Sequence, residues 1–375
     1  MSKSDLTQCV HGPSSGGEKN KGVLSPIYTS TAYNYLDADP LNYPRYFNTI
    51  NQKEVSQKIA LLENGEFGMV FSSGLAAITT VLMALLKSGD HAILQGDIYG
   101  GTYYSVTQEL IKFGVEISFT ENTETHSFES LIKKNTKLIF IETPSNPLLK
   151  ITDIEEIAAL CKKYSLISVI DNTFASPINQ KPINWGIDVV THSGTKYLGG
   201  HSDITAGAVV TSKLLGEKIY KTGVNLGGSL DPQTCYLLDR SIKTLAIRVK
   251  QQNENAQKLA EYLSEHTSVK NVFYPGLKNH DGYEIARKQM IGFGGMLSFE
   301  VKANPDEFVK KLRLIKPAIS LGSVESTVSS PVQTSHSKLT AEQRKKAGIS
   351  DSLLRLSVGI EDSEELIEDL NMALK

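Results

Sequence analysis

The sequence predicts an α/β fold, with a mostly parallel sheet in a large domain and a smaller α+β domain at the C-terminus. Two apolar runs, Lys137–Glu142 and Leu166–Asp171, each end in a carboxylate and flank a helical pattern over Ile154–Tyr164. This order is typical of a βαβ unit, in which both strands run parallel in one sheet. A third apolar run, Ile187–Val190, leads into the polar stretch Thr191–Gly200. The ends of these strands are expected at one sheet edge, where α/β enzymes bind their ligands.

Length and composition limit the classes of protein that fit. A chain of 375 residues exceeds the usual size of one core, which predicts two domains. The net charge is −2 without basic or acidic blocks, so neither nucleic acid nor a membrane surface is an expected partner. The longest mostly apolar run, Leu75–Leu86, is shorter than the roughly 18 residues of a spanning helix. The polar N-terminus lacks the apolar core of a signal peptide, so we expect a cytoplasmic protein.

The chain divides into an arm and two domains. Residues 1–47 are rich in Gly, Ser, Asn and Tyr and show little periodicity, which predicts an extended arm. We expect the large domain over 48–244 and the C-terminal domain over 245–375. A helical pattern over 231–266 predicts one long helix that bridges them, with the boundary near Thr244.

Strands and helices alternate in the C-terminal part of the chain. Gly295–Phe299 is a predicted strand and Pro305–Leu314 a predicted helix, which favours an α+β domain. The cysteines are too few and too far apart for a disulfide framework or a metal site, so we expect no metal; they are Cys9, Cys161 and Cys235.

Lys196 stands beside an anion-binding pattern. Ser193 and Thr195 offer two hydroxyls and two backbone amides, and Lys196 adds an amine where the predicted strand gives way to a loop. A partly desolvated amine loses its charge more readily, which favours a Schiff base with an aldehyde. Pyridoxal 5′-phosphate (PLP) carries both an aldehyde and a phosphate. An ordinary surface lysine after a turn is the alternative for this stretch alone.

Asp171 supplies the anion that a PLP site needs. It ends a predicted strand at the same sheet edge as Lys196. A carboxylate facing the pyridine nitrogen keeps that nitrogen protonated, so the ring can accept electrons. By itself, Asp171 is equally well explained as a strand-end residue that caps the next turn. Together with Lys196 and the neighbouring hydroxyls, it predicts a PLP site.

Three segments resemble the trans-sulfuration family of cysteine and methionine metabolism: Asp171–Phe174, Ser193–Tyr197 and Gly200–Asp203. The family comprises cystathionine γ-synthase, the cystathionine β- and γ-lyases, methionine γ-lyase and the O-acetylhomoserine sulfhydrylases, and the resemblance runs from about Gly22 to the C-terminus. It implies a fold type I, aspartate aminotransferase-like PLP enzyme that acts on a small sulfur amino acid. It also implies a homodimer at least, typically a homotetramer.

The resemblance assigns the arm to the cofactor. In relatives, the segment that matches Tyr43 and Arg45 reaches into the neighbouring subunit and binds the cofactor phosphate, for which arginine offers a planar fork of donors. An aromatic arm that packs on its own subunit is the alternative. Thr49 stands where relatives commonly have proline, which puts the path of this loop in question.

The resemblance also gives roles to residues near other strand ends. Ser72 and Ser73 suit a helix N-cap, so the free amides of Gly74 and Leu75 can hold the phosphate, although a plain cap is the alternative. Tyr99 is expected to stack on the pyridine ring and to act as an acid or base. Asn146 is expected to donate to the phenolate oxygen of the cofactor and to lie against the substrate; turn chemistry alone is its alternative.

Two segments are expected to bind the substrate. Arg355 lies in an apolar strand, where a guanidinium needs a carboxylate partner; in relatives this is the substrate α-carboxylate, and a protein carboxylate is the alternative. Ser320 is expected to assist. Ile319 replaces a glutamate of many γ-synthases and γ-lyases, and Gly101 replaces the cysteine of methionine γ-lyases, so the member of the family stays open.

The resemblance therefore implies a PLP-dependent carbon–sulfur lyase of the cystathionine lyase type, in which Lys196, Tyr99 and Asp171 are catalytic. Elimination at the β or γ carbon gives a thiol, ammonia and a 2-oxo acid. A γ-replacement synthase of the cystathionine γ-synthase or sulfhydrylase type is the main alternative. An aminotransferase and a non-catalytic PLP-binding protein are further alternatives.

Overall fold

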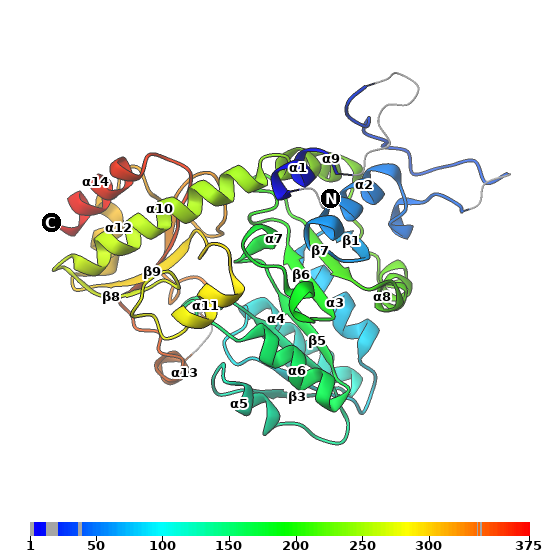
Figure 1. Cartoon of the computed structure of the whole chain (residues 1–375), viewed down its shortest axis with the longest axis horizontal. Helices are drawn as coiled ribbons and strands as arrows, with labels where there is room; N and C mark the ends of the chain where they lie inside the picture. Colours follow the sequence, from blue (N-terminus) through cyan, green and yellow to red (C-terminus); the bar gives the residue numbers. More distant parts are fainter. Residues whose placement is uncertain (1–3, 13–21, 37–39, 336, 338–339) are drawn as a thin grey trace.

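The computed structural model describes residues 4–12, 22–36, 40–335, 337 and 340–375 (Figure 1). Its larger sheet has seven strands in the order β1-β7-β6-β5-β4-β2-β3. Neighbours from β6 through β3 are parallel, and β7 is antiparallel to both β1 and β6. The predicted mostly parallel sheet is confirmed. Its strands are β1 Phe67–Phe71, β2 His91–Leu94, β3 Glu116–Phe119, β4 Thr136–Glu142, β5 Ile167–Asp171, β6 Val189–Ser193 and β7 Gly207–Thr211.

The predicted βαβ unit is present as β4, α6 (Ile154–Tyr164) and β5. The carboxylate of Asp153 caps α6 by accepting from the backbone N–H of Glu156 at 3.0 Å, and the helix ends at Ser165 in the left-handed conformation. The register pairs Glu142 with Asp171. The two carboxyl groups at the strand ends are therefore neighbours at one edge of the sheet.

Helices cover both faces of the larger sheet. Helices α2 (Ile50–Leu62), α6, α9 (Pro232–Ile242) and the start of α10 (Leu245–Glu265) pack on one face, and α3 (Gly74–Leu85) and α8 (Lys213–Leu226) on the other. Because both faces are buried, the polar chemistry is confined to the ends of the strands. Shorter helices are α1 Asp5–Val10, α4 Gly100–Tyr104, α5 Thr125–Glu129 and α7 Ser176–Asn179.

The C-terminal part forms a second core around a five-stranded sheet in the order β10-β11-β12-β9-β8. Its pairs are antiparallel except β10 with β11. Helix α10 contributes to this core and to the core of the larger sheet. The elements are β8 Val269–Phe273, α11 Tyr283–Gln289, β9 Met296–Val301, α12 Pro305–Lys311, β10 Lys316–Pro317, β11 Thr327–Ser329, α13 Ala341–Lys346, β12 Leu353–Ser357 and α14 Ser363–Leu374.

The single helix predicted over 231–266 is wrong, because the chain breaks between α9 and α10. Thr244 leaves the helical conformation, with φ −107° and ψ 4°. The guanidinium of Arg248 donates to the carbonyl of Ser241 at 3.0 Å and to the hydroxyl of Thr244 at 3.2 Å. Ile242 and Leu245 pack in the same core on either side of the break. The apolar periodicity therefore continues through the break and hides it.

The predicted end of the helix over 305–314 is also wrong, because α12 stops at Lys311. The buried carboxylate of Asp369 on α14 accepts from the backbone N–H groups of Arg313, Leu314 and Ile315 at 2.8, 3.1 and 2.9 Å. These amides therefore bind a side chain distant in the sequence instead of continuing the helix.

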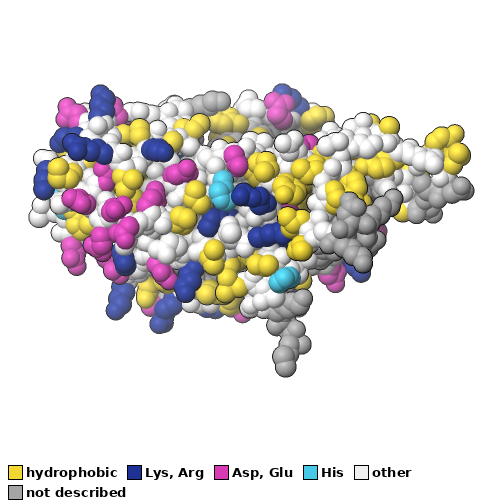
Figure 2. Space-filling model, turned by 90° about the horizontal axis from the view of Figure 1, so that it is seen from above, with side chains coloured by type: hydrophobic (Ala, Val, Ile, Leu, Met, Phe, Trp, Pro, Cys, Tyr) yellow, Lys and Arg dark blue, Asp and Glu magenta, His cyan; other side chains and the backbone are white. Residues whose placement is uncertain are grey.

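Among the described residues, no helix is both long and apolar enough to cross a membrane. In the same residues, no group of three His, Cys, Asp or Glu side chains could hold a metal ion. The three cysteines are free and buried. On the face in Figure 2, acidic and basic side chains are interspersed.

The Asp369 contact gives a test of the fold. Asp369→Ala should lower the free energy of unfolding by about 3 kcal/mol, because three backbone amides, that of Ile315 buried, lose a charged acceptor. The measurement is urea denaturation, with Glu368→Ala, an exposed neighbour on the same helix, as the control. Equal stability of the two variants would contradict this account of where α12 ends.

Candidate active site

A cavity of about 700 Å³ lies at the carboxyl ends of β4, β5 and β6 and is closed on its other side by residues of the C-terminal part of the chain. Of the predicted site residues, it brings together Gly74, Leu75, Tyr99, Asn146, Asp171, Ser193, Thr195, Lys196, Ile319, Ser320 and Arg355. Tyr43 and Arg45 do not line it.

The amine of Lys196 lies inside this cavity, in the turn that follows β6. Its Nζ donates to Oγ of Ser320 at 2.6 Å. Burial, aided by the nearby Arg355 guanidinium, lowers the pKa of Lys196 to about 8. A substantial share of the amine is therefore neutral near physiological pH, which a nucleophilic lysine requires.

Asp171 presents a buried carboxylate at the end of β5. It accepts hydrogen bonds from the hydroxyl and the backbone N–H of Thr173, and the same hydroxyl accepts from the backbone N–H of Ser193 at 2.8 Å. Burial raises the pKa of Asp171, whereas the Thr173 hydrogen bonds and His192 lower it. Thr173 thus ties the carboxylate to the segment that carries Lys196.

The start of α3 forms an anion cradle. The Ser73 side chain caps the helix by accepting from the N–H of Ala76 at 3.1 Å, and the first amides of any helix lack acceptors within it. A Cβ on Gly74 would lie 2.8 Å from Cβ of Ser193. Glycine therefore allows the helix start to approach β6 and brings its amides beside Ser193.

The hydroxyl of Thr195, in contrast, is already engaged within the fold. It accepts from the backbone N–H of Ala206 at 3.0 Å and donates to the carbonyl of the same residue at 3.3 Å. Thr195 still lines the cavity, but its hydroxyl fixes the turn before Lys196 as well.

Tyr99 precedes α4, and its ring is half exposed. Its backbone N–H donates to Glu142 at 2.6 Å. A Cβ on Gly101 would lie 2.4 Å from Cε1 of the Tyr99 ring. A side chain at 101, such as cysteine, would therefore require this ring to move.

Arg355 on β12 is a buried guanidinium that binds neutral groups. Its Nη1 donates to Oδ1 of Asn146 at 2.8 Å and its Nη2 to the carbonyl of Ser320 at 3.2 Å, while its Nε has no partner. Burial lowers the pKa of Arg355 to about 10. In the described part of the chain, no carboxylate forms an ion pair with it within 4 Å. The predicted alternative, a protein carboxylate, is therefore wrong for these residues.

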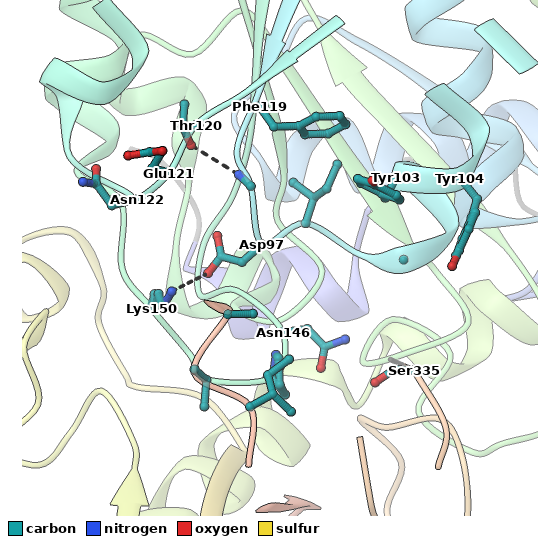
Figure 3. Close-up of a pocket in the computed structure, with 17 residues that line it drawn as sticks. Asp97, Tyr103, Tyr104, Phe119, Thr120, Glu121, Asn122, Asn146, Lys150 and Ser335 are labelled. Carbon is teal, nitrogen blue, oxygen red and sulfur yellow. Dashed lines mark hydrogen bonds and ion pairs between the residues drawn. The ribbon is translucent and has the colours of Figure 1, made fainter. Parts of the chain in front are cut away.

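A second cavity of about 400 Å³ adjoins the first and shares Asn146 and Ser335 with it (Figure 3). Tyr103 and Phe119 lie on one side of it. Asp97 lies on another, with its carboxylate 3.8 Å from the ammonium of Lys150. Its one lysine is already paired with Asp97, whereas the larger cavity contains an amine of lowered pKa, so we assign the chemistry to the larger cavity.

Comparison with known proteins decides the family. The model of the Cys/Met metabolism PLP-dependent enzyme family matches residues 6–375. The chain belongs to this family. It is 45% identical to cystathionine γ-lyase of Bacillus subtilis over 98% of both chains, and 42% identical to a cystathionine β-lyase of the same organism over 98% of this chain and 96% of the relative. A solved cystathionine γ-lyase of Lactobacillus plantarum superposes with a TM-score of 0.96 at 40% identity, over 99% of this chain and 98% of that one.

Membership of the family confirms the predicted PLP-dependent enzyme with the type I fold. The cofactor is PLP, and the chain is a lyase of the trans-sulfuration type. The cavity fits this cofactor on its own geometry. It combines an amine of lowered pKa, a carboxylate at a strand end and a glycine-lined helix start, in Lys196, Asp171 and Gly74.

Tyr43 and Arg45, the two predicted site residues of the arm, lie outside the cavity. Nη1 of Arg45 donates to the carbonyl of Val224 at 2.5 Å. The guanidinium lies 5.7 Å from the centre of the Tyr43 ring and 5.0 Å from that of Tyr46.

Sequence reasoning gave no role to several residues that line the cavity, among them Glu142 and Thr173. Burial and the neighbouring Asp171 raise the pKa of Glu142 well above its usual range. Glu142 ends its strand as Asp171 does, so the same pattern could have identified it. Thr173 lies in the segment Asp171–Phe174 that resembles the family. Its hydrogen bonds to Asp171 depend on the local turn, which the pattern does not predict.

The lowered pKa of Lys196 predicts how the PLP-free protein takes up cofactor. Only the neutral amine attacks an aldehyde, so the uptake rate should rise with pH around a midpoint near 8. An ordinary lysine, with a pKa near 10.5, would give a midpoint more than two units higher. The measurement follows the visible PLP absorbance between about pH 6.5 and 10.

Arg355→Gln is the matched variant, because removal of the guanidinium should raise the midpoint. Uptake rates that still rise steeply at pH 10 in both proteins, as for an ordinary lysine, would contradict the proposed environment of Lys196.

Proposed function

We propose that Lys196 holds PLP through its aldehyde, and that Asp171 pairs with the pyridine nitrogen. The phosphate would lie on the amides of Gly74 and Leu75, beside the residues that follow β6, Ser193 and Thr195. Figure 1 shows α3 beside β6, and their contact at Gly74 supports this placement. Tyr99 would stack on the ring, and Asn146, whose oxygen binds Arg355, can offer its two N–H donors to the phenolate oxygen.

Arg355 is the main reason to propose an amino acid as the substrate. Arg355 is 6% exposed, lines the cavity and has a free Nε, so its guanidinium is suited to bind an anion there. The α-carboxylate of an amino acid supplies it, with Ser320 and Asn146 beside it. The contact of Ser320 with Nζ of Lys196 supports a substrate carboxylate bound next to the base.

The proposed reaction is elimination of a thiolate from a sulfur amino acid such as cystathionine. PLP, when bound, accepts the electron pair released at Cα. The freed amine of Lys196 removes the Cα proton, and the Tyr99 phenol can protonate the departing sulfur. Cleavage at Cβ releases the thiol, and addition of water to the remaining three-carbon unit gives pyruvate and ammonia. If Lys196 also moves a proton from Cβ, cleavage at Cγ gives 2-oxobutanoate, or a new thiol is accepted instead.

The choice between β and γ chemistry depends on the mouth of the cavity. Ile319 lies there and is 74% exposed, so it offers no charge to a distal ammonium group. The relatives above include both a γ-lyase and a β-lyase. We propose a cystathionine lyase, with γ-replacement on an O-acylhomoserine as the alternative that product analysis separates.

We further propose a homodimer, paired into a homotetramer, in which Tyr43 and Arg45 complete the partner's site. Within the arm, α1 packs into the core through Cys9, so the extended conformation predicted over residues 1–47 is wrong for this helix. The segment 22–36 projects away from the body of the molecule (Figure 1). It exposes large apolar side chains, among them Val23 at 91% and Tyr35 at 73%. Such surface is typical of an interface with another chain. We propose the domain boundary at Thr244, where α9 and α10 meet, and a cytoplasmic location.

The central test is product release from cystathionine. The wild-type protein should release pyruvate or 2-oxobutanoate with a thiol amino acid. Lys196→Ala should lose the visible band of bound PLP and lower turnover by at least about a thousandfold, because the proton transfers lose their base. Lys150→Ala, in the adjoining cavity, is the control and should remain active. A yellow, active Lys196→Ala protein would refute the assignment, and pyridoxamine phosphate without ammonia would indicate an aminotransferase.

Complementation tests the shared site. Arg45→Ala and Lys196→Ala should each be nearly inactive. In a mixed dimer, one of the two sites has both native residues, so random mixing should restore about a quarter of the wild-type activity. Ser193→Ala mixed with Lys196→Ala is the control and should restore none, because both residues belong to one chain's site. No recovery in the first mixture would place Arg45 outside the partner's site.

A further inference from the structure

Arg248 on α10 is a buried cation without a carboxylate. Its side chain is 3% exposed. In the described residues, its donors go to two backbone carbonyls and one hydroxyl, and no ion pair includes it. Burial lowers its pKa to about 10. Because such burial is costly, the contacts that Arg248 makes need an explanation.

One of these contacts fixes the residue next to the reactive lysine. Nη1 of Arg248 donates to the carbonyl of Tyr197 at 2.9 Å. It also fills the space beside Gly200, where a Cβ would lie 2.1 Å from Nη1 and φ is +67°. The N–H of Gly200 in turn donates to the carbonyl of Lys196 at 2.7 Å. Arg248 therefore contacts both ends of the turn that carries Lys196.

The same helix holds the loop on the substrate side. Nε2 of Gln252, one turn after Arg248, donates to the carbonyl of Ser323 at 2.7 Å. The N–H of Val324 donates to the carbonyl of Gly200 at 3.0 Å. The loop that carries Ser320 is thus joined to the turn of Lys196, and both rest on α10.

We propose that Arg248 is a positioning residue for Lys196: its fork of donors fixes the turn 196–200, so that the amine stays buried between Ser320 and Arg355. Capping of α9 explains only its contact with Ser241. It does not explain the contact with Tyr197 or the glycine at 200. A lysine cannot replace this arginine, because one ammonium group does not reach three acceptors arranged for a planar fork. The inference rests on the proposed role of Lys196 as the residue that binds PLP.

Competitive labelling with acetic anhydride tests this in the full-length protein after removal of PLP. Peptide mass spectrometry compares labelling of Lys196 with that of the exposed Lys87 between about pH 6.5 and 10.5. The wild-type protein should give a Lys196 pKa near 8. Arg248→Met and Gly200→Ala should each raise it by about one unit or more, and PLP uptake at pH 8 should slow about fivefold or more. The double variant should shift no further than the single ones, because both break one contact.

Lys58→Met is the matched control. Lys58 is buried and pairs with Asp239 on α9, so its loss should lower the melting temperature and leave the titration of Lys196 unchanged. The proposal is overturned if Arg248→Met and Gly200→Ala lower the melting temperature as Lys58→Met does but leave the pKa of Lys196 near 8.

If Arg248→Met does not fold, Arg248→Lys and Gly200→Ala decide the question by the same criterion. Failure of the proposed function gives a different result. If Lys196 does not bind PLP, Lys196→Ala retains the visible band of PLP, whether or not Arg248 is also substituted.

Discussion

The constraint on which the site depends is the burial of an amine beside a guanidinium. Lys196 and Arg355 share one cavity. Burial lowers the pKa of both groups, and the charge of Arg355 lowers the pKa of Lys196 further. Across the cavity lie two buried carboxyl groups, Asp171 and Glu142, whose pKa values burial raises. The amine suits the aldehyde of the cofactor, and the guanidinium suits the carboxylate of a substrate. The carboxyl groups on the other side suit the protonated ring nitrogen of the cofactor. Burial, together with repulsion from Arg355, disfavours the charged form of Lys196 and so makes the amine a nucleophile and a base.

The scaffold supplies this arrangement through strand ends. Parallel pairing aligns Glu142, Asp171 and the residues after β6 at one edge. The second sheet places Arg355 opposite them. Helix α10 spans both cores, and its Arg248 and Gln252 hold the two loops that meet at Lys196. The helix break at Thr244 lets Arg248 reach these groups, so the feature that interrupts the helix also supports the site.

Much of the site could be predicted because its parts lie in contiguous segments. Lys196, Asp171 and Gly74 each follow a strand or begin a helix, so local patterns place them at one edge. The long-range contacts could not be predicted in this way. Asp369 ends α12 from more than fifty positions away, and Arg248 contacts Tyr197 from another element. The break between α9 and α10 was missed because apolar residues continue across it. The role proposed for Tyr43 and Arg45 requires a second chain, so it remains a proposal.

The most direct test is a crystal structure of the wild-type protein grown with PLP. The account predicts continuous density from Nζ of Lys196 to the cofactor, Asp171 within hydrogen-bonding distance of the pyridine nitrogen, and the phosphate on the amides of Gly74 and Leu75. Density that leaves Nζ on Ser320, or that turns the ring nitrogen away from Asp171, would contradict it.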